Sequence, residues 1–98
     1  MGSISLDSKR ISEFCRRHGV RRLSLFGSAT RDDFGPESDL DVLVEFEPDR
    51  VPGLAFFAME EELGRIVGRR VDLNTPGFLS PGIRARILAE AVLHYEQA

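Results

Sequence analysis

The chain has 98 residues, of which 42% are hydrophobic and 30% are charged, and its net charge at pH 7 is −3. This length predicts one compact domain over residues 1–98. The negative charge argues against direct binding of nucleic acid, because a protein that grips the phosphate backbone needs an excess of basic residues. The single cysteine, Cys15, excludes an internal disulfide, and neither a signal segment nor a membrane span is visible, so we expect a cytoplasmic protein.

Hydrophobic periodicity predicts a helix and two strands in the first half of the chain. Apolar residues at helical spacing predict a helix over residues 8–18, with Ser8 as its cap. The pattern then alternates over residues 20–26, which predicts a strand, and a short helix is expected to begin at Ser28. Residues 39–46 alternate most clearly and form the second predicted strand.

The second half is predicted to fold as a helix, a strand and a further helix. An amphipathic helix is expected over residues 56–67, and a short strand follows over residues 71–74. A Ser-Pro pair at residues 80–81 is typical of a helix start, and this last helix is expected to reach residue 91. Residues 92–95 either extend it or form a final strand. This order indicates an α+β fold with one layer of helices on a small sheet.

Three aspartates lie on the predicted strands. Side chains two residues apart on a strand point to the same face, so Asp39 and Asp41 project together, about 6.6 Å apart along the strand. Two carboxylates side by side repel each other unless a cation lies between them, and hard oxygen ligands of this kind suit Mg²⁺. Asp72 joins them if its strand lies beside theirs. Taken singly, the Asp-x-Asp pair also fits a solvated strand face, and Asp72 also fits a surface acid.

The predicted turn from strand to helix at Gly27 and Ser28 is typical of an anion site. Backbone N–H groups at the start of a helix point outward with the positive end of the helix dipole. Gly27 lets the backbone approach phosphate oxygens, the Ser28 hydroxyl adds a donor, and Arg31 can reach the same charge. In isolation the Gly-Ser pair also fits a plain turn with a helix cap. Beside three acids it predicts nucleotidyl transfer, which needs metal-neutralised phosphates and an activated hydroxyl.

The combined motif resembles that of a known family. Gly27-Ser28, Arg31 and Ser38-Asp39-Leu40-Asp41 are similar to the Gly-Ser…Asp-x-Asp signature of the DNA polymerase beta superfamily, and specifically to its minimal nucleotidyltransferase (MNT) branch. The similarity extends over nearly the whole chain and includes the later strand Val71-Asp72-Leu73 and the closing segment Ile87-Leu88…Ala91…Tyr95.

This resemblance implies a nucleotidyltransferase fold with a small mixed sheet and helices packed on one face. It implies a Mg²⁺-dependent enzyme that transfers a nucleoside monophosphate, AMP from ATP, to a hydroxyl on a partner protein and releases pyrophosphate. The implied partner is a small helical protein of the HEPN ribonuclease type, toward which the chain acts as antitoxin. The implied site residues are Asp39, Asp41 and Asp72 for catalysis and metal binding, and Gly27, Ser28, Arg31 and Ser38 for the nucleotide.

Two other functions stay open at this point. The chain could be a non-catalytic module that neutralises its partner by covering it. It could also be a transferase for a small molecule such as an aminoglycoside, which is disfavoured because one small domain has no second lobe to clasp such an acceptor. Four arginines are expected on solvated helix ends, with contact to a nucleotide or an acidic partner as the alternative: Arg69, Arg70, Arg84 and Arg86.

Overall fold

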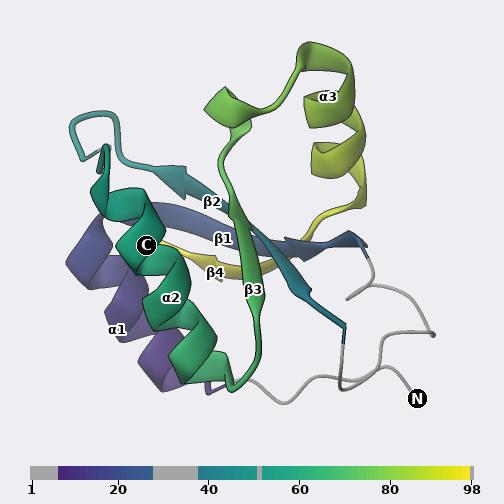
Figure 1. Cartoon of the computed structure of the whole chain (residues 1–98). Coiled ribbons are helices and arrows are strands. Elements are labelled where there is room, and N and C mark those ends of the chain that lie inside the picture. The colour runs from purple at the N-terminus through teal and green to yellow at the C-terminus, as the bar shows by residue number, and fades with distance from the viewer. Residues whose placement is uncertain (1–6, 28–37, 51, 98) are drawn as a thin grey trace.

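The computed structural model describes residues 7–27, 38–50 and 52–97. In chain order the elements are α1 (Ser8–His18), β1 (Val20–Phe26), β2 (Leu40–Phe46), α2 (Ala55–Val67), β3 (Val71–Asn74), the 3-10 helix η2 (Pro76–Phe78), α3 (Pro81–Glu90) and β4 (Val92–Glu96). The strands form one mixed sheet in the order β3-β2-β1-β4, in which β2 is parallel to β3 and antiparallel to β1 (Figure 1). The predicted α+β class is confirmed.

The structure also decides the predictions about element ends. The last helix stops at Glu90, and the residues after it pair with β1, so the final-strand alternative is the correct one. The cap of α1 is Asp7, whose carboxylate accepts the N–H groups of Lys9 and Arg10 at 3.1 and 3.2 Å. The prediction that Ser8 is the cap was therefore wrong by one residue. The helix expected to begin at Ser28 lies outside the described residues.

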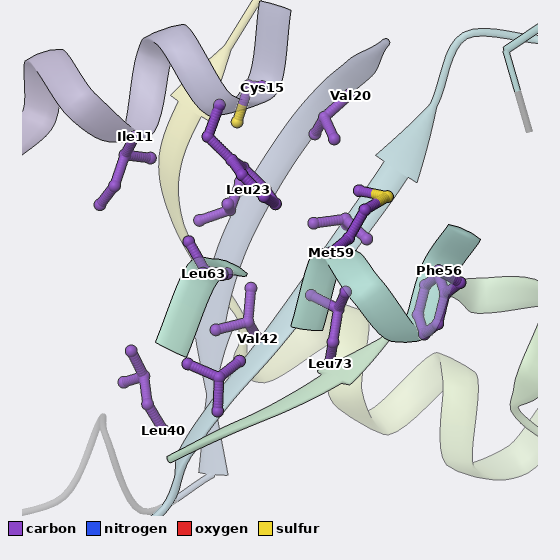
Figure 2. Close-up of a cluster of buried hydrophobic side chains, with 13 residues drawn as sticks. Ile11, Cys15, Val20, Leu23, Leu40, Val42, Phe56, Met59, Leu63 and Leu73 are labelled. Atoms are coloured by element: carbon purple, nitrogen blue, oxygen red, sulfur yellow. The ribbon is translucent and has the colours of Figure 1, made fainter. Parts of the chain in front are cut away.

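One hydrophobic core lies between the sheet and the pair of helices α1 and α2, which lie side by side on one face of the sheet (Figure 1). Figure 2 shows apolar side chains from both helices meeting those of the strands. Burial raises the pKa of the Cys15 thiol to about 12. The core side chains are Ile11, Phe14, Cys15, Val20, Leu23, Leu40, Val42, Val44, Phe56, Met59, Leu63, Val71 and Leu73.

Polar contacts join the two helices at the edge of this core. Glu62 of α2 accepts a hydrogen bond from Arg17, and its Oε1 lies 3.0 Å from Nε2 of His18. The hydrogen bond from Arg17 holds the pKa of Glu62 below its ordinary value of 4.5. The His18 ring also packs against Phe14, with ring centroids 4.8 Å apart. His18 therefore has a structural environment between the helices.

A second carboxylate of α2 contacts the outer edge of the sheet. Glu60 Oε2 accepts the backbone N–H of Leu73, in the edge strand β3, at 2.8 Å. An edge strand otherwise presents its outward N–H groups to solvent. The contact fixes α2 against the strand that carries Asp72.

The third helix stands apart from the α1–α2 layer (Figure 1). None of its residues is buried, and the half-buried Arg84 donates from its guanidinium to the carbonyls of Pro76 and Leu79 at 2.9 and 3.1 Å. The expectation that Arg84 sits on a solvated helix end is therefore wrong. In the described ranges no helix has the length and apolar character that a membrane span requires.

Candidate functional site

Two of the predicted acids are direct partners across neighbouring strands. The parallel register of β2 and β3 sets Asp41 opposite Asp72. Their flanking residues in the same strands are buried in the core, so alternation directs both carboxylates to the face that α1 and α2 leave uncovered. Asp41 is half-buried and Asp72 is exposed. The fold thus brings together two acids that lie 31 positions apart in the chain.

The third acid, Asp39, lies directly before β2 and is exposed. Arg70 Nε lies 3.9 Å from Asp39 Oδ1, and the two side chains are 82% and 48% exposed. An ion pair this open to water contributes little stability. Its effect is local, since it sets a positive charge beside the Asp39 carboxylate.

Gly27, at the end of β1, fits closely against Asp41. Its φ is +65°, which is the left-handed region that favours glycine. A methyl group at this position would lie 2.4 Å from Oδ2 and 3.2 Å from Cγ of Asp41. The register explains the approach, because Phe26 is the partner of Asp41. Gly27 of the Gly-Ser pair and Asp41 of the Asp-x-Asp pair therefore lie next to each other.

The rest of the predicted nucleotide site is only partly described. Ser38 is half-buried, and its carbonyl accepts a hydrogen bond of 3.1 Å from Nη1 of Arg69. Ser28 and Arg31 lie outside the described residues, so their assignment to the phosphates stays a prediction.

Comparison with known proteins gives the family. A family described as "Nucleotidyltransferase domain" matches residues 8–94, which is most of the chain. The chain belongs to the nucleotidyltransferase domain family. It is therefore an enzyme of the nucleotidyltransferase class, and the resemblance inferred from the motif is confirmed.

Relatives of this nucleotidyltransferase include proteins that are named protein adenylyltransferases. It is 41% identical over 81 residues to the protein adenylyltransferase MntA of Thermococcus cleftensis, an alignment that covers 82% of this chain and 80% of the relative.

Solved structures that share the fold include two toxin–antitoxin structures. One is a toxin–antitoxin structure with AMP-PNP, at a TM-score of 0.77 and 19% identity over 94% of this chain and 75% of the other. The other is a complex of a triply AMPylated HEPN toxin from Shewanella oneidensis with an MNT antitoxin, at a TM-score of 0.67 and 17% identity, covering 92% of this chain and 70% of the other.

The acids of the nucleotidyltransferase suit a hard divalent cation by their chemistry. Asp39, Asp41 and Asp72 offer carboxylate oxygens on one face, and Mg²⁺ characteristically takes one or two carboxylates together with phosphate oxygens of a substrate. Within the described part of the chain, no group of three Asp, Glu, His or Cys side chains is arranged so that it could hold a metal ion. Asp41 and Asp72, which are partners across β2 and β3, are the pair that would supply carboxylates to such a cation.

A separate hollow lies at the other end of β2. A pocket of about 430 Å³ is lined mainly by apolar residues, among them the buried Phe56. The Phe56 ring packs edge-on against Phe78 and Phe46, with centroids 5.1 and 6.3 Å apart. None of the three acids lines this pocket. The carboxylate face is therefore not part of this hollow.

Sequence reasoning missed the contacts of Arg69 and Arg70 with the acidic motif. Both arginines were expected on solvated helix ends, yet Arg69 donates to the backbone of Ser38 and Arg70 faces Asp39. The available signal was their position directly before the strand that carries Asp72, because that strand lies beside β2.

Proposed function

We propose that this nucleotidyltransferase moves AMP from ATP to a hydroxyl on a partner protein in a Mg²⁺-dependent reaction. The observation that carries the proposal is the register pairing of Asp41 with Asp72 at the point where Gly27 approaches. The name of the Thermococcus cleftensis relative and the AMPylated toxin in the Shewanella oneidensis complex support AMP as the transferred group.

In this proposal Asp39, Asp41 and Asp72 hold Mg²⁺, and Gly27, Ser28, Arg31 and Ser38 contact the nucleotide. Bound Mg²⁺ neutralises the phosphate oxygens and lowers the pKa of the acceptor hydroxyl. The hydroxyl oxygen forms a bond to the α-phosphorus, and its proton passes to water. The bond from that phosphorus to the bridging oxygen breaks, and pyrophosphate leaves with this oxygen.

We further propose a small helical partner of the HEPN type and an antitoxin role in the cytoplasm. The toxin–antitoxin structures described above, which share the fold, support this partner class. The free, buried thiol of Cys15 suits a reducing compartment. The net charge of −3 gives no support for direct binding of nucleic acid.

The test is label transfer from ATP to the product of the neighbouring reading frame in the presence of Mg²⁺. Label on the α-phosphate should reach the partner, label on the γ-phosphate should not, and EDTA should stop the reaction. Asp41→Asn keeps the size of the side chain and removes its charge, and we expect a loss of at least ~100-fold. The matched control is Asp49→Asn, which changes an exposed acid in the turn after β2.

The outcomes separate catalysis from binding alone. A wild-type protein that transfers no α-label with Mg²⁺ would overturn the proposed activity. If Asp41→Asn loses transfer and still neutralises the partner in cells, then the biological role is complex formation, which was the alternative left open by the sequence. Loss of neutralisation together with transfer supports catalysis as the role.

A further inference from the structure

The three acids of the candidate site are held in place by different means. Asp41 and Asp72 belong to the hydrogen-bonded ladder of β2 and β3. Asp39 does not, because the register of β2 with β3 begins at Leu40 and that of β2 with β1 ends at Asp41. Pairing within the sheet therefore leaves the direction of the Asp39 side chain to other contacts.

The turn between α2 and β3 supplies contacts of this kind. Arg69 Nη1 donates to the carbonyl of Ser38 at 3.1 Å. The Leu40 N–H donates to the carbonyl of Arg70 at 3.0 Å, and Arg70 Nε lies 3.9 Å from Asp39 Oδ1. Each of the three consecutive residues around Asp39 thus touches one of two consecutive arginines.

The turn that presents these arginines is itself well fixed. Gly68 ends α2 with a φ of +75°, and the N–H groups of Gly68 and Arg69 both donate to the carbonyl of Gly64, at 2.9 and 3.2 Å. This pattern closes a helix by satisfying its last carbonyls. The backbone of Arg69 therefore has a defined position relative to α2.

The two arginines differ in how firmly they can hold the segment. The Arg70 side chain is 82% exposed, and its distance to Asp39 is long, so water screens that pair. Arg69 is half-buried and makes a hydrogen bond from a charged donor, which is stronger than a neutral one. Arg69 is consequently the better-defined of the two contacts.

We propose that Arg69 is a positioning residue of the candidate metal site, which holds the Ser38 carbonyl and so fixes the direction in which Asp39 points. The inference rests on the proposed function, because it takes Asp39 as a metal ligand. Groups that orient a ligand without touching the metal are needed for its affinity, since a displacement of about 1 Å is enough to weaken a site.

The test uses the whole chain and measures Mn²⁺ binding in the presence of AMP-PNP by electron paramagnetic resonance of the free ion. We expect Arg69→Gln to weaken Mn²⁺ binding about tenfold. Arg69→Lys keeps a charged donor and should recover part of the affinity. Arg65→Gln removes one positive charge from an exposed position near the same end of α2 and should bind Mn²⁺ as the wild type does.

The direction of the change in Mn²⁺ affinity distinguishes a positioning role of Arg69 from a purely electrostatic one. Removing a positive charge near three carboxylates should by itself strengthen the binding of a cation, because a repulsive charge is lost. Weaker binding in Arg69→Gln, with an unfolding temperature close to that of Arg65→Gln, therefore supports positioning. If Arg69→Gln does not fold, the Mn²⁺ affinity of Arg69→Lys is measured in its place. Binding weaker than that of the wild type then supports positioning.

Unchanged or tighter Mn²⁺ binding by a folded Arg69 variant would overturn the inference and leave the proposed function standing. A wild-type protein that binds no Mn²⁺ with AMP-PNP would overturn the proposed function, and this inference with it.

Discussion

Gly27→Ala should separate the stability of the fold from the function of the candidate site. Two costs follow from the structure. An L-residue forced into the left-handed region at φ +65° loses about 1–2 kcal/mol of stability. The new methyl group would also lie 2.4 Å from Asp41 Oδ2, where ordinary contacts begin at 3.4 Å. The carboxylate therefore has to retreat by about 1 Å, a displacement that can cost ~100-fold in rate.

Gly53→Ala provides a matched control. Gly53 has a φ of +63°, and nothing lies within 4 Å of the position its methyl group would take. This variant has the same backbone strain without the contact to Asp41. Each kcal/mol corresponds to about 4–8 °C in the unfolding temperature of a domain of this size.

The assay is the rate of α-label transfer from ATP, measured beside thermal unfolding followed by circular dichroism. We expect comparable losses of unfolding temperature in the two variants and a ~100-fold loss of rate in Gly27→Ala alone. Equal rates in the two folded variants would refute the reasoning, because the approach of Gly27 to Asp41 would then have no bearing on transfer.

Three further predictions concern stability and reactivity. Because the pKa of Glu62 is lowered in the folded state, its contribution is present above its ordinary pKa of 4.5 and is lost as the pH falls through the folded value. The unfolding temperature of Glu62→Gln should therefore lie below that of the wild type at pH 7, and a gap that stays constant down to acid pH would contradict this. Cys15, with its pKa raised to about 12, should react with iodoacetamide at pH 8 only after unfolding by urea, and fast alkylation of the folded chain would show that the thiol is open. Glu60→Ala should lose about 1–3 kcal/mol in urea unfolding because the N–H of Leu73 loses its acceptor, whereas Glu60→Gln keeps an acceptor oxygen and should lose less.

The elements of the core were predictable because their apolar residues repeat with the period of the element. Helix α1 begins and ends where its pattern does, because it buries one face against the core. Strand β2 ends as predicted and begins at Leu40, one residue after the predicted start at Asp39, whose side chain is exposed. Strand β4 was ambiguous because nearly all of its side chains are exposed. It is a strand because it pairs with β1, not because it buries one face. Pairing alone produces no alternation of apolar and polar residues that the sequence could show.

The candidate site could be predicted from the sequence only in part, for a similar reason. Alternation predicts which face Asp41 and Asp72 share, but their adjacency depends on the parallel pairing of two strands, which no local pattern encodes. Gly27 was interpreted as a point of approach for phosphate, whereas the structure also shows it making room for the Asp41 carboxylate. The residue types themselves give no signal for the contact of Arg69, because its acceptor is a backbone carbonyl, which every residue has.

The hydrogen bond from Leu73 to Glu60 also bears on how this protein can assemble. Strands at the edges of sheets are where other chains add by β-pairing, and this sheet has its edges at β3 and β4. One edge N–H of β3 is already occupied by a side chain of the protein's own helix. A strand added at β3 would have to displace this contact, whereas β4 lies at the opposite edge of the sheet from Asp72. Pairing at β4 would leave the sheet unextended next to the acids.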